Sequence, residues 1–526
     1  GAPETPRAER KAALARRIKA CLRPLLDRGA IGRAQFKACA MGATRALFRK
    51  QGLTGRLPSD LEVREAAHAA VEVATADLRD CRVSTRQGSM ADSAPLDADV
   101  LVVGAGVVGL ATARSLGALS GVRGILVDQN RMYREMHSDP YYVHMQRAAL
   151  PYWRSLERES STLLLKECGL LFFGDPSTGE TVEGSIEGAL DTMRAGSMKH
   201  EHMKSLAELC ERWPLKIAAR ARDEETSSAQ SSPVDWQGIW DPRAGWVRAS
   251  RAVAALASQV ERNPRWQVMR GVGVAGLAAD GRGVCARLAD GRRVRAKKLV
   301  LACGAWTGDV LGLLGKRMEL EIWRMHWGYC AAGEAALRRV PMWYCFQKPK
   351  ERQGGLRDGG LYYGFPAEEE VGWSRVDEKP LNSHAPSTHP HARQLKVGID
   401  WVPEGEEFRP RSMAQFDSRP SPVMRSLLES FLERHWEGMG PLDHLVVSPY
   451  SMTPDLNFVL GQLPDLENVF IFAGDCGRAF KFAPLLGQCL AEKVLGRPTS
   501  FDVAPLDPGR ACLQYRQRLP HHRSAL

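Results

Sequence analysis

Hydrophobic residues form two short runs between residues 99 and 128, on either side of a stretch with helical spacing. The first run ends at Gly104 and the second ends at Asp128. This pattern predicts a strand, a helix and a second strand, which together form a βαβ unit. Because the two strands of such a unit are parallel, we predict an α/β fold.

The glycines after the first run follow the pattern of a dinucleotide-binding turn. Gly104 permits a tight turn, Gly106 lets a pyrophosphate approach the backbone, and Gly109 lets the helix pack closely on the sheet. Asp128 would accept hydrogen bonds from ribose hydroxyls and would disfavour a 2′-phosphate, so FAD or NAD is favoured over NADP. A glycine-rich turn without a ligand is the structural alternative.

The rest of the chain alternates between helical and strand patterns. We predict helices over residues 142–159, 423–435 and 480–495, a mostly helical segment over 177–213, a turn into a helix over 245–260, strands over 168–174, 324–330, 360–365, 395–401 and 469–473, and a hairpin formed by 268–279 and 284–288. The strand patterns between residues 320 and 436 indicate an antiparallel sheet. Further strand-to-helix turns at Gly304, Gly474 and Gly477 would offer backbone N–H groups to a ligand oxygen.

Composition changes this picture mainly at the N-terminus. The chain has 526 residues, of which 44% are apolar, so it can bury a large core. Its formal charge of +11 comes mostly from residues 1–90, which hold 18 Lys and Arg against 9 Asp and Glu. Helical spacing over residues 8–50 and 60–78 predicts a basic helical module there, and the polar stretch 82–96 predicts a linker.

Two classes of protein are disfavoured by the sequence. Twelve cysteines are scattered without a CxxC pair or a metal-ligand cluster, so we expect reduced thiols and no bound metal. The longest apolar run, around residues 101–113, is too short to span a bilayer. We therefore expect an intracellular protein, in the cytoplasm or in peroxisomes, that does not bind a membrane.

Seven stretches, in the same order along the chain, resemble the monomeric sarcosine oxidase and pipecolate oxidase group of FAD-dependent amine oxidoreductases. The resemblance covers about residues 98–510. The stretches are the glycine pattern at Gly104, Arg131-x-x-Arg134, Gly304-Ala-Trp306, residues 360–366, Leu395-Lys-x-Gly398, Thr453-Pro-Asp455-x-x-Phe458 and Gly474-x-x-Gly477-x-x-Phe480-Lys481-Phe482.

The resemblance implies a Rossmann-like FAD-binding domain and an antiparallel-sheet substrate domain, preceded by a small helical module. We place the helical module at 1–80, the linker at 81–97, the oxidoreductase at 98–510 and a tail at 511–526, with FAD-binding segments at about 98–175, 245–320 and 445–510 and the substrate domain at about 176–244 and 321–444.

The resemblance also implies a site in which Arg134 and Lys481 hold the carboxylate of a small amino acid, with Tyr450 beside it. A guanidinium and an ammonium suit this role because together they fix the carboxylate and present the Cα–H to a flavin. The residues implied for cofactor binding are Gly104, Gly106, Gly109, Asp128, Val274, Gly304, Trp306, Gly474, Gly477 and Phe480. Ordinary core positions are the alternative for Val274 and Tyr450.

Four features depart from the pattern of this group. Ser448 stands where the group has its flavin-linking cysteine, so we expect noncovalent FAD. Only two residues separate Asp128 from Arg131, where the group has a loop over the flavin. Arg478 stands where histidine is usual, and we match no residue to the oxygen-activating lysine of the oxidases. The missing loop therefore bears on FAD affinity, and the unmatched lysine predicts slow reoxidation by oxygen.

The reaction implied is oxidation of the C–N bond of a secondary or N-substituted amino acid such as sarcosine or pipecolate, giving an imine and hydrogen peroxide. Two alternatives stay open. One is a dehydrogenase that passes the electrons to an acceptor other than oxygen, which the unmatched lysine favours. The other is an interaction protein with a degenerate flavin domain. We expect a monomer.

A weaker resemblance concerns residues 14–78. Lys19, Leu22, Pro24, Ile31 and Phe36 match positions of the helical C-terminal module of the PHD-and-RING-finger and SR-related CTD-associated factors. That resemblance implies an acidic or phosphorylated protein partner. A basic helical pair without such a partner is the alternative.

Overall fold

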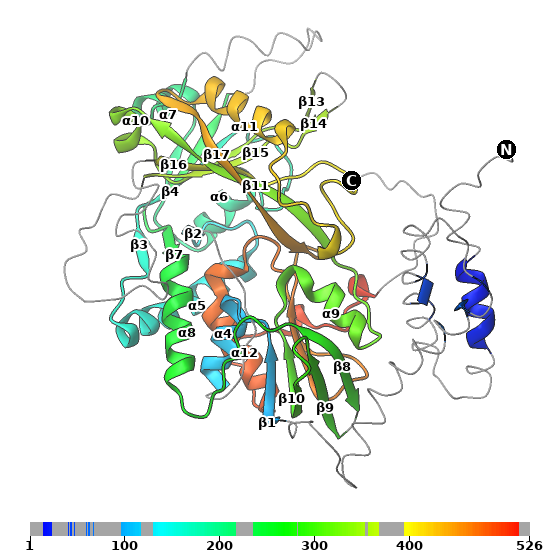
Figure 1. Ribbon diagram of the computed structural model, residues 1–526. Helices are drawn as coiled ribbons and strands as arrows, with labels where there is room; N and C mark the ends of the chain where they lie inside the picture. Colours follow the sequence, from blue (N-terminus) through cyan, green and yellow to red (C-terminus); the bar gives the residue numbers. More distant parts are fainter. Residues whose placement is uncertain are drawn as a thin grey trace, which may run out of the picture. The chain divides into compact units, whose positions relative to one another are not determined.

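The computed structural model of the chain describes residues 14–23, 40, 43–44, 47, 59, 62–63, 67, 96–116, 130–216, 235–280, 282–352, 356–367 and 394–514. The chain divides into two compact units. One comprises residues 1–101, 272–298 and 309–318, and the other comprises residues 102–271, 299–308 and 319–526. Figure 1 shows the helices and strands, whose labels are used below.

The N-terminal part of the first unit contains a small helical core. Residues 14–23 are helical, and Leu14, Ile18 and Leu22 are buried at helical spacing. They cluster with apolar side chains from further along this part of the chain, up to Ala67. The described residues therefore contain part of the predicted helical module. Most of the predicted helix over 60–78 and the linker over 82–95 lie outside them.

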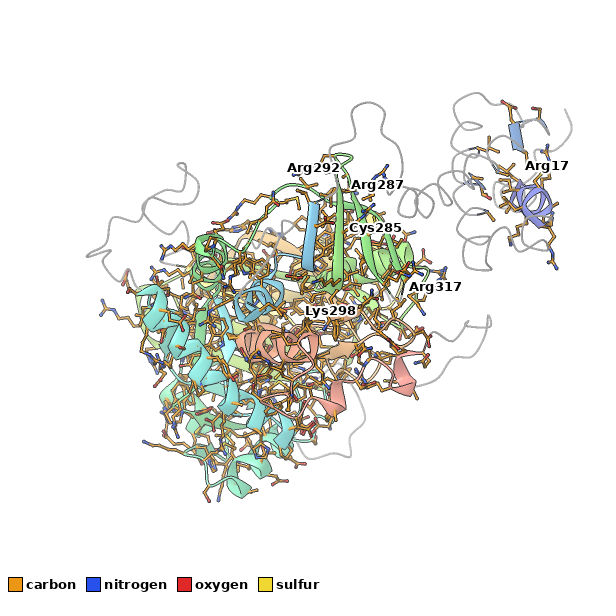
Figure 2. All side chains as sticks on the ribbon, turned by 90° about the horizontal axis from the view of Figure 1, so that it is seen from below. Arg17, Cys285, Arg287, Arg292, Lys298 and Arg317 are labelled. Carbon is orange, nitrogen blue, oxygen red and sulfur yellow. The ribbon has the colours of Figure 1, made fainter. Side chains whose placement is uncertain are left out.

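The same unit contains a β-hairpin that was predicted from the sequence. Strands β8 (Val274–Asp280) and β9 (Gly283–Leu288) pair antiparallel, and β9 pairs in the same way with the start of β10 (Arg293–Leu301). Arg287 lies on β9, Arg292 lies in the turn to β10, and Lys298 lies on β10 (Figure 2).

The second unit contains the glycine-rich turn, between β1 (Leu96–Val103) and α4 (Val107–Leu116). Beside this turn the main-chain N–H of Ala302 donates to the Val103 carbonyl, over 2.9 Å. The end of β10 pairs in parallel with β19 (Val469–Ala473), and β18 (Val459–Gln462) pairs antiparallel with β19. The α/β prediction is confirmed, whereas the predicted second strand with Asp128 lies outside the described residues.

Helices pack around this part of the second unit (Figure 1). They are α4, α5 (Pro140–Ser160), α8 (Ala249–Arg262) and α12 (Ala483–Val494). At Gly487 of α12 a Cβ would lie 2.5 Å from the Cβ of Ala111 on α4, so the two helices approach closely there. Asp139 caps α5 by accepting a hydrogen bond from the Tyr141 N–H.

The second unit also contains an eight-stranded sheet in the order β17-β11-β16-β15-β12-β4-β6-β5. The strands are β4 (Leu170–Gly174), β5 (Glu201–Met203), β6 (Gln237–Asp241), β11 (Glu321–Ala332), β12 (Trp343–Phe346), β15 (Leu361–Phe365), β16 (Gln394–Ile399) and β17 (Met439–Met452). Most pairs are antiparallel, as predicted for residues 320–436, while β12 and β4 pair in parallel. Strand β4 therefore lies in this sheet and not with the strands of the glycine-rich turn.

Helices cover both faces of this sheet. Leu428 of α11 (Pro422–His435) and Leu209 of α7 (Leu206–Arg212) belong to the apolar cluster on one face, and Leu190 of α6 (Ile186–Ala195) belongs to the cluster on the other. The rings of Tyr362 and Phe431 stack with centroids 4.0 Å apart. Aromatic packing of this kind makes the sheet a rigid support for the side chains that it carries.

A three-stranded sheet in the order β2-β7-β3 completes the second unit. It consists of β2 (Asn130–Tyr133), β7 (Gly245–Arg248) and β3 (Leu165–Glu167). The prediction of a turn at residues 245–248 is wrong, because these residues form β7. Trp246 and Val247 are fully buried, and this burial outweighs the turn preference of Gly245.

The remaining elements are short. They are α9 (Thr307–Leu313), α10 (Glu334–Arg339), β13 (Lys350–Arg352), β14 (Leu356–Asp358), and the 3₁₀ helices η2 (Gly304–Trp306), η3 (Met413–Gln415), η4 (Ala479–Phe482), η5 (Ala504–Leu506) and η6 (Ala511–Leu513). Within the described ranges, no helix is long and apolar enough to cross a membrane, and no three His, Cys, Asp or Glu side chains gather as a metal site.

Candidate active site

Two glycines of the glycine-rich turn lie in close packing. Gly104 has a φ of 111°, and a Cβ there would lie 2.1 Å from the Ala302 carbonyl oxygen. At Gly109 a Cβ would lie 2.0 Å from the carbonyl oxygen of Gly104. Neither position accepts a side chain, so the turn and the helix contact require glycine as the sequence analysis predicted.

Other glycines border open space. At Gly106 and at Gly304, whose φ is 53°, a Cβ would meet nothing within 4 Å. Gly106 directly precedes α4, which has no acidic residue in its first turn. A helix N-terminus with a bare, accessible backbone suits the phosphates of a dinucleotide, so the residues present fit this part of FAD. Nearby, Trp306 is 53% exposed.

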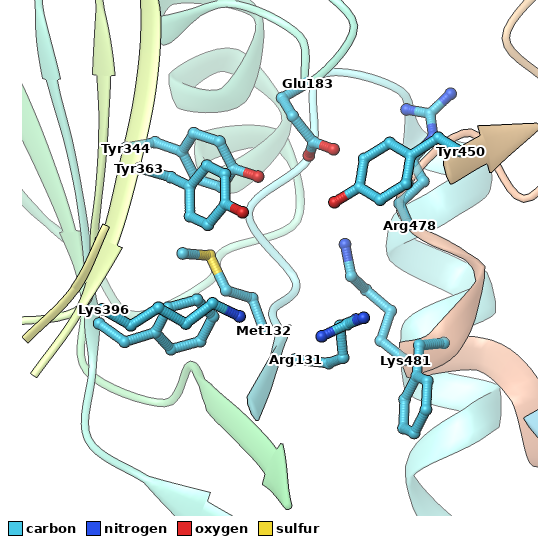
Figure 3. A pocket seen from close by; sticks show the side chains of 12 residues that line it. Arg131, Met132, Glu183, Tyr344, Tyr363, Lys396, Tyr450, Arg478 and Lys481 are labelled. Atoms are coloured by element: carbon cyan, nitrogen blue, oxygen red, sulfur yellow. The ribbon is translucent and has the colours of Figure 1, made fainter. Parts of the chain in front are cut away.

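A cavity of about 40 Å³ lies elsewhere in the second unit. It is lined by side chains from β2, the turn before α6, and strands β12, β15, β16 and β17, and by the segment around η4. Figure 3 shows polar groups converging on it from all of these elements. The groups include Arg131, Glu183, Tyr344, Lys396, Tyr450 and Lys481.

Lys481 presents its ammonium group to this cavity (Figure 3). The side chain is 5% exposed, and the described residues offer Nζ no hydrogen-bond acceptor. Burial lowers the pKa of Lys481 to about 7, although the charge of Glu183 opposes this shift. Trp153 holds the short helix in place, since its Nε1 donates to the Lys481 carbonyl over 2.7 Å and its ring stacks on Phe480.

Arg134, the second residue implied for carboxylate binding, is fully buried and does not line the cavity. Its guanidinium forms an ion pair with Glu183 and donates to the Met136 carbonyl. It also lies over the Phe172 ring, 4.8 Å from the centroid. The cavity therefore brings Lys481 and Glu183 together, with Arg134 contacting Glu183.

Glu183 was missed by the sequence analysis. It lies in a tight turn in which Thr181 and Gly184 are bridged, and Gly184 has a φ of 92°. Arg478 Nη1 donates to the Val182 carbonyl over 3.3 Å and so holds this turn. Burial raises the pKa of Glu183, but the charges of Lys481, Arg134 and Arg478 outweigh burial and keep the pKa below its usual value.

Asp400 was also missed. It follows β16 and is buried, and its Oδ2 accepts a hydrogen bond from the Tyr344 hydroxyl over 2.9 Å. Burial and the charge of Glu183 raise the pKa of Asp400 to about 7. The pKa values of Glu183 and Asp400 thus shift in opposite directions. Of the two carboxyl groups, Glu183 is the one that forms an ion pair with a described residue, Arg134.

The cavity also contains a lysine, Lys396, for which the sequence analysis gave no role. It lies on β16 within the stretch that carries part of the resemblance, and it is 3% exposed. Its Nζ lies 4.5 Å from the ring centroid of Trp327 and 4.9 Å from that of Phe365. Burial, together with the nearby charge of Arg131, lowers the pKa of Lys396 well below its usual value.

Two residues of β17 border the same region. Tyr450 lines the cavity, and burial raises the pKa of its hydroxyl. A Cβ at Gly477 would lie 2.4 Å from the Tyr450 ring, so the close approach of ring and backbone requires glycine. Ser448 Oγ accepts a hydrogen bond from Trp327 Nε1 over 3.2 Å.

The turn after β19 differs from the prediction that the N–H groups of its two glycines face a ligand oxygen. Gly474 and Gly477 have positive φ values of 63° and 70°. The Gly477 N–H, expected to face a ligand, instead donates to the Asp475 carboxylate over 3.0 Å. Asp475 also accepts from the Ser451 N–H, so this carboxylate organises the turn. Arg478 lies against the Tyr142 ring, 4.4 Å from its centroid.

The second unit thus combines a glycine-rich turn that suits a dinucleotide with a buried cavity lined by charged and aromatic side chains. A profile of the DAO family, described as FAD dependent oxidoreductase, matches residues 99–493. The chain belongs to this family. Its expected dependence on FAD is thereby confirmed.

Relatives are similar over most of the chain. Monomeric sarcosine oxidase of Bacillus sp. (strain NS-129) is 25% identical over 432 residues, covering 79% of this chain and 97% of that protein. Peroxisomal sarcosine oxidase of Homo sapiens is 25% identical over 431 residues, covering 77% and 94%. The solved open form of NikD, an unusual amino acid oxidase, superposes with a TM-score of 0.64 at 25% identity, covering 81% of this chain and all of that one.

Proposed function

We propose that this protein oxidises the C–N bond of a secondary or N-substituted amino acid such as sarcosine or pipecolate, giving an imine and hydrogen peroxide. One observation carries the proposal: the cavity presents the ammonium of Lys481 and the carboxylate of Glu183 together. An amino acid zwitterion carries the complementary pair of charges on neighbouring atoms. The similarity to sarcosine oxidases supports the same substrate class.

The residues of the chain bind and orient the substrate. Lys481 Nζ holds the substrate carboxylate, because the described residues leave its donors open to the cavity. Arg134 forms an ion pair with Glu183 and so holds this carboxylate beside the cavity. Tyr450 borders the bound substrate. Aromatic side chains, among them Tyr363, Phe365 and Phe480, line the cavity beside these charged groups, and such surroundings of low polarity strengthen charge interactions.

FAD supplies the redox chemistry when it is bound, by accepting the two electrons and the hydrogen that leave the substrate. We infer that Gly106 and Gly304 leave room for its phosphates, while Gly104 and Gly109 shape the turn. We also infer that Asp128, Val274, Trp306, Gly474 and Phe480 complete its site. Ser448 offers a hydroxyl and no thiol, so the flavin is held noncovalently. Acid precipitation tests this attachment, since the flavin must then remain in the supernatant.

Oxygen is the proposed electron acceptor. Reduction of oxygen builds up negative charge. Arg131 places positive charge at one side of the cavity, and Lys396 Nζ adds N–H donors there. The alternative of a dehydrogenase rested on the lack of a matched lysine, and Lys396 removes that reason. A monomer in the cytoplasm or in peroxisomes remains our expectation, the latter supported by the name of the human relative.

The test is to reconstitute the protein with FAD, add sarcosine or L-pipecolate in air, and measure peroxide and oxygen consumption. One peroxide per oxygen consumed supports the proposal. Lys396→Met must slow reoxidation and leave flavin reduction unchanged, while Lys493→Met, an exposed position on α12, leaves both unchanged. Dye reduction without oxygen consumption would identify a dehydrogenase, and failure to bind FAD would identify an interaction protein.

A further inference from the structure

Two carboxyl groups beside one cavity lie in opposite electrostatic environments. Glu183 is ion-paired with Arg134, whereas Asp400 is bonded to the neutral hydroxyl of Tyr344. Neighbouring acids that are separated in this way take different roles in proton transfer. Glu183 stays ionised and binds, which leaves Asp400 as the group that exchanges a proton.

We propose that Tyr344 and Asp400 form a relay that removes the proton from the substrate ammonium before its oxidation. The inference rests on the proposed function, since it concerns the same bound amino acid. The substrate N–H bond breaks as a bond forms to the Tyr344 hydroxyl oxygen, and the hydroxyl proton passes to Asp400 Oδ2. The substrate nitrogen then carries its free electron pair, which oxidation of the adjacent carbon requires.

The geometry places each member of the relay in sequence. Tyr344 lines the cavity, and its hydroxyl points toward the side where Glu183 lies (Figure 3). The same hydroxyl donates to Asp400 over 2.9 Å, so a proton moves between them without rearrangement. Asp400 itself does not line the cavity. In this relay a proton from the bound substrate therefore reaches Asp400 through the Tyr344 hydroxyl.

The charges around Asp400 support its role as the acceptor. Burial and Glu183 raise its pKa to about 7, so it is ionised above that pH and takes up a proton readily near neutrality. The titratable and charged groups that face it are Glu183, Arg134, Tyr344, Tyr363, Tyr450, Arg478 and Lys481.

Other groups near the cavity are poorer acceptors. The Arg134 ion pair keeps the pKa of Glu183 low, so Glu183 is a weak base. His137 is buried and does not line the cavity, and burial with the charge of Arg134 lowers its pKa well below the usual value. Lys481 is committed to the substrate carboxylate.

The test compares Asp400→Asn and Tyr344→Phe with the wild-type holoenzyme. Anaerobic rapid mixing with sarcosine gives the rate of flavin reduction at a series of pH values. In the wild type this rate rises with pH and levels off above about pH 7. In both variants the rate at neutral pH falls roughly 100-fold, and the rise extends toward the pKa of the free ammonium, about 10.

The chain offers a matched control. Tyr362 donates to Asp358 over 2.9 Å and is equally buried, but neither residue lines the cavity. Tyr362→Phe must therefore keep the wild-type pH profile. If Asp400→Asn fails to retain FAD, Tyr344→Phe carries the same test, because it leaves the carboxyl in place and removes the only hydroxyl of the relay.

A second readout needs no turnover. The infrared difference spectrum of the wild type between pH 6 and pH 8.5, on either side of about pH 7, must show loss of a protonated carboxyl band that Asp400→Asn lacks. Variants with the wild-type profile, or a wild type without this band, would overturn the relay alone. A wild-type flavin that no amino acid reduces would overturn the proposed function as well.

Discussion

Lys481 is the single side chain on which substrate binding depends most. Its buried Nζ faces the cavity and has no hydrogen-bond acceptor among the described residues, so a bound carboxylate would supply one. Lys481→Met is expected to weaken the binding of acetate, a minimal carboxylate, by at least about tenfold. Lys493→Met is the control with unchanged affinity. Equal acetate affinity in wild type and Lys481→Met would contradict the role of this ammonium.

The same residue gives acetate binding a pH dependence. The lowered pKa means that Lys481 is charged below about pH 7 and loses its charge above it. Acetate therefore binds more tightly at pH 6 than at pH 8.5, roughly tenfold per unit above the pKa, and Lys481→Met reduces this slope. Titrations followed by the flavin absorbance measure it. A slope that is identical in the variant would exclude Lys481 as its source.

Glu183 has a structural as well as a binding role. Its ion pair with Arg134 is buried, so removing one charge leaves the other uncompensated. Glu183→Gln is expected to lower the free energy of unfolding by about 3 kcal/mol, and Glu183→Gln with Arg134→Met recovers most of the loss. Urea unfolding measures the free energy of unfolding of the single and the double variant. A single variant as stable as the wild type would show that the pair does not hold this turn.

The residues of the cavity were only partly predictable. Lys481 and Tyr450 lie in stretches with a recognisable pattern, but Glu183 lies in a polar segment without one. Lys396 is hidden in a strand whose other residues are apolar. These side chains meet only because distant segments fold together, and no local spacing encodes that meeting.

Among the elements, the glycine-rich turn contains one glycine that packing requires, Gly104, and one that borders open space, Gly106. Gly104→Ala places a Cβ on the Ala302 carbonyl at a positive φ, and it is expected to destabilise the protein by about 2 kcal/mol or more. Gly106→Ala meets open space, so it is expected to fold normally and to bind FAD more weakly. Thermal unfolding of the FAD-free protein and FAD titration distinguish them, and the reverse pattern would contradict these assignments.

The elements that were predicted well are those with a strong local pattern. Strand β19 and helix α11 match their predicted ranges within a residue, since apolar periodicity and flanking glycine or proline fix their ends. The four-residue strand β7 is too short to show a period, and only its pairing with β2 and β3 identifies it. The parallel pairing of β4 with β12 joins segments far apart in sequence, which no local pattern reveals.

At the scale of the whole molecule, the N-terminal part is expected to be dispensable for flavin chemistry. Among the described residues, its apolar cluster draws on residues between 14 and 67, and the family match begins at residue 99. Deleting residues 1–80 should leave FAD content and kcat unchanged. Absorbance and turnover of the truncated protein check this, and loss of FAD on truncation would show that the basic module contributes to the enzyme.

Anaerobic mixing of the FAD-loaded protein with sarcosine or L-pipecolate shows whether this chain is a flavin-dependent oxidoreductase of amino acids. We expect the visible absorbance of the flavin to bleach with one of these substrates, and Lys481→Met to slow bleaching at a given concentration. A full complement of bound FAD that no secondary or N-substituted amino acid bleaches would contradict this expectation.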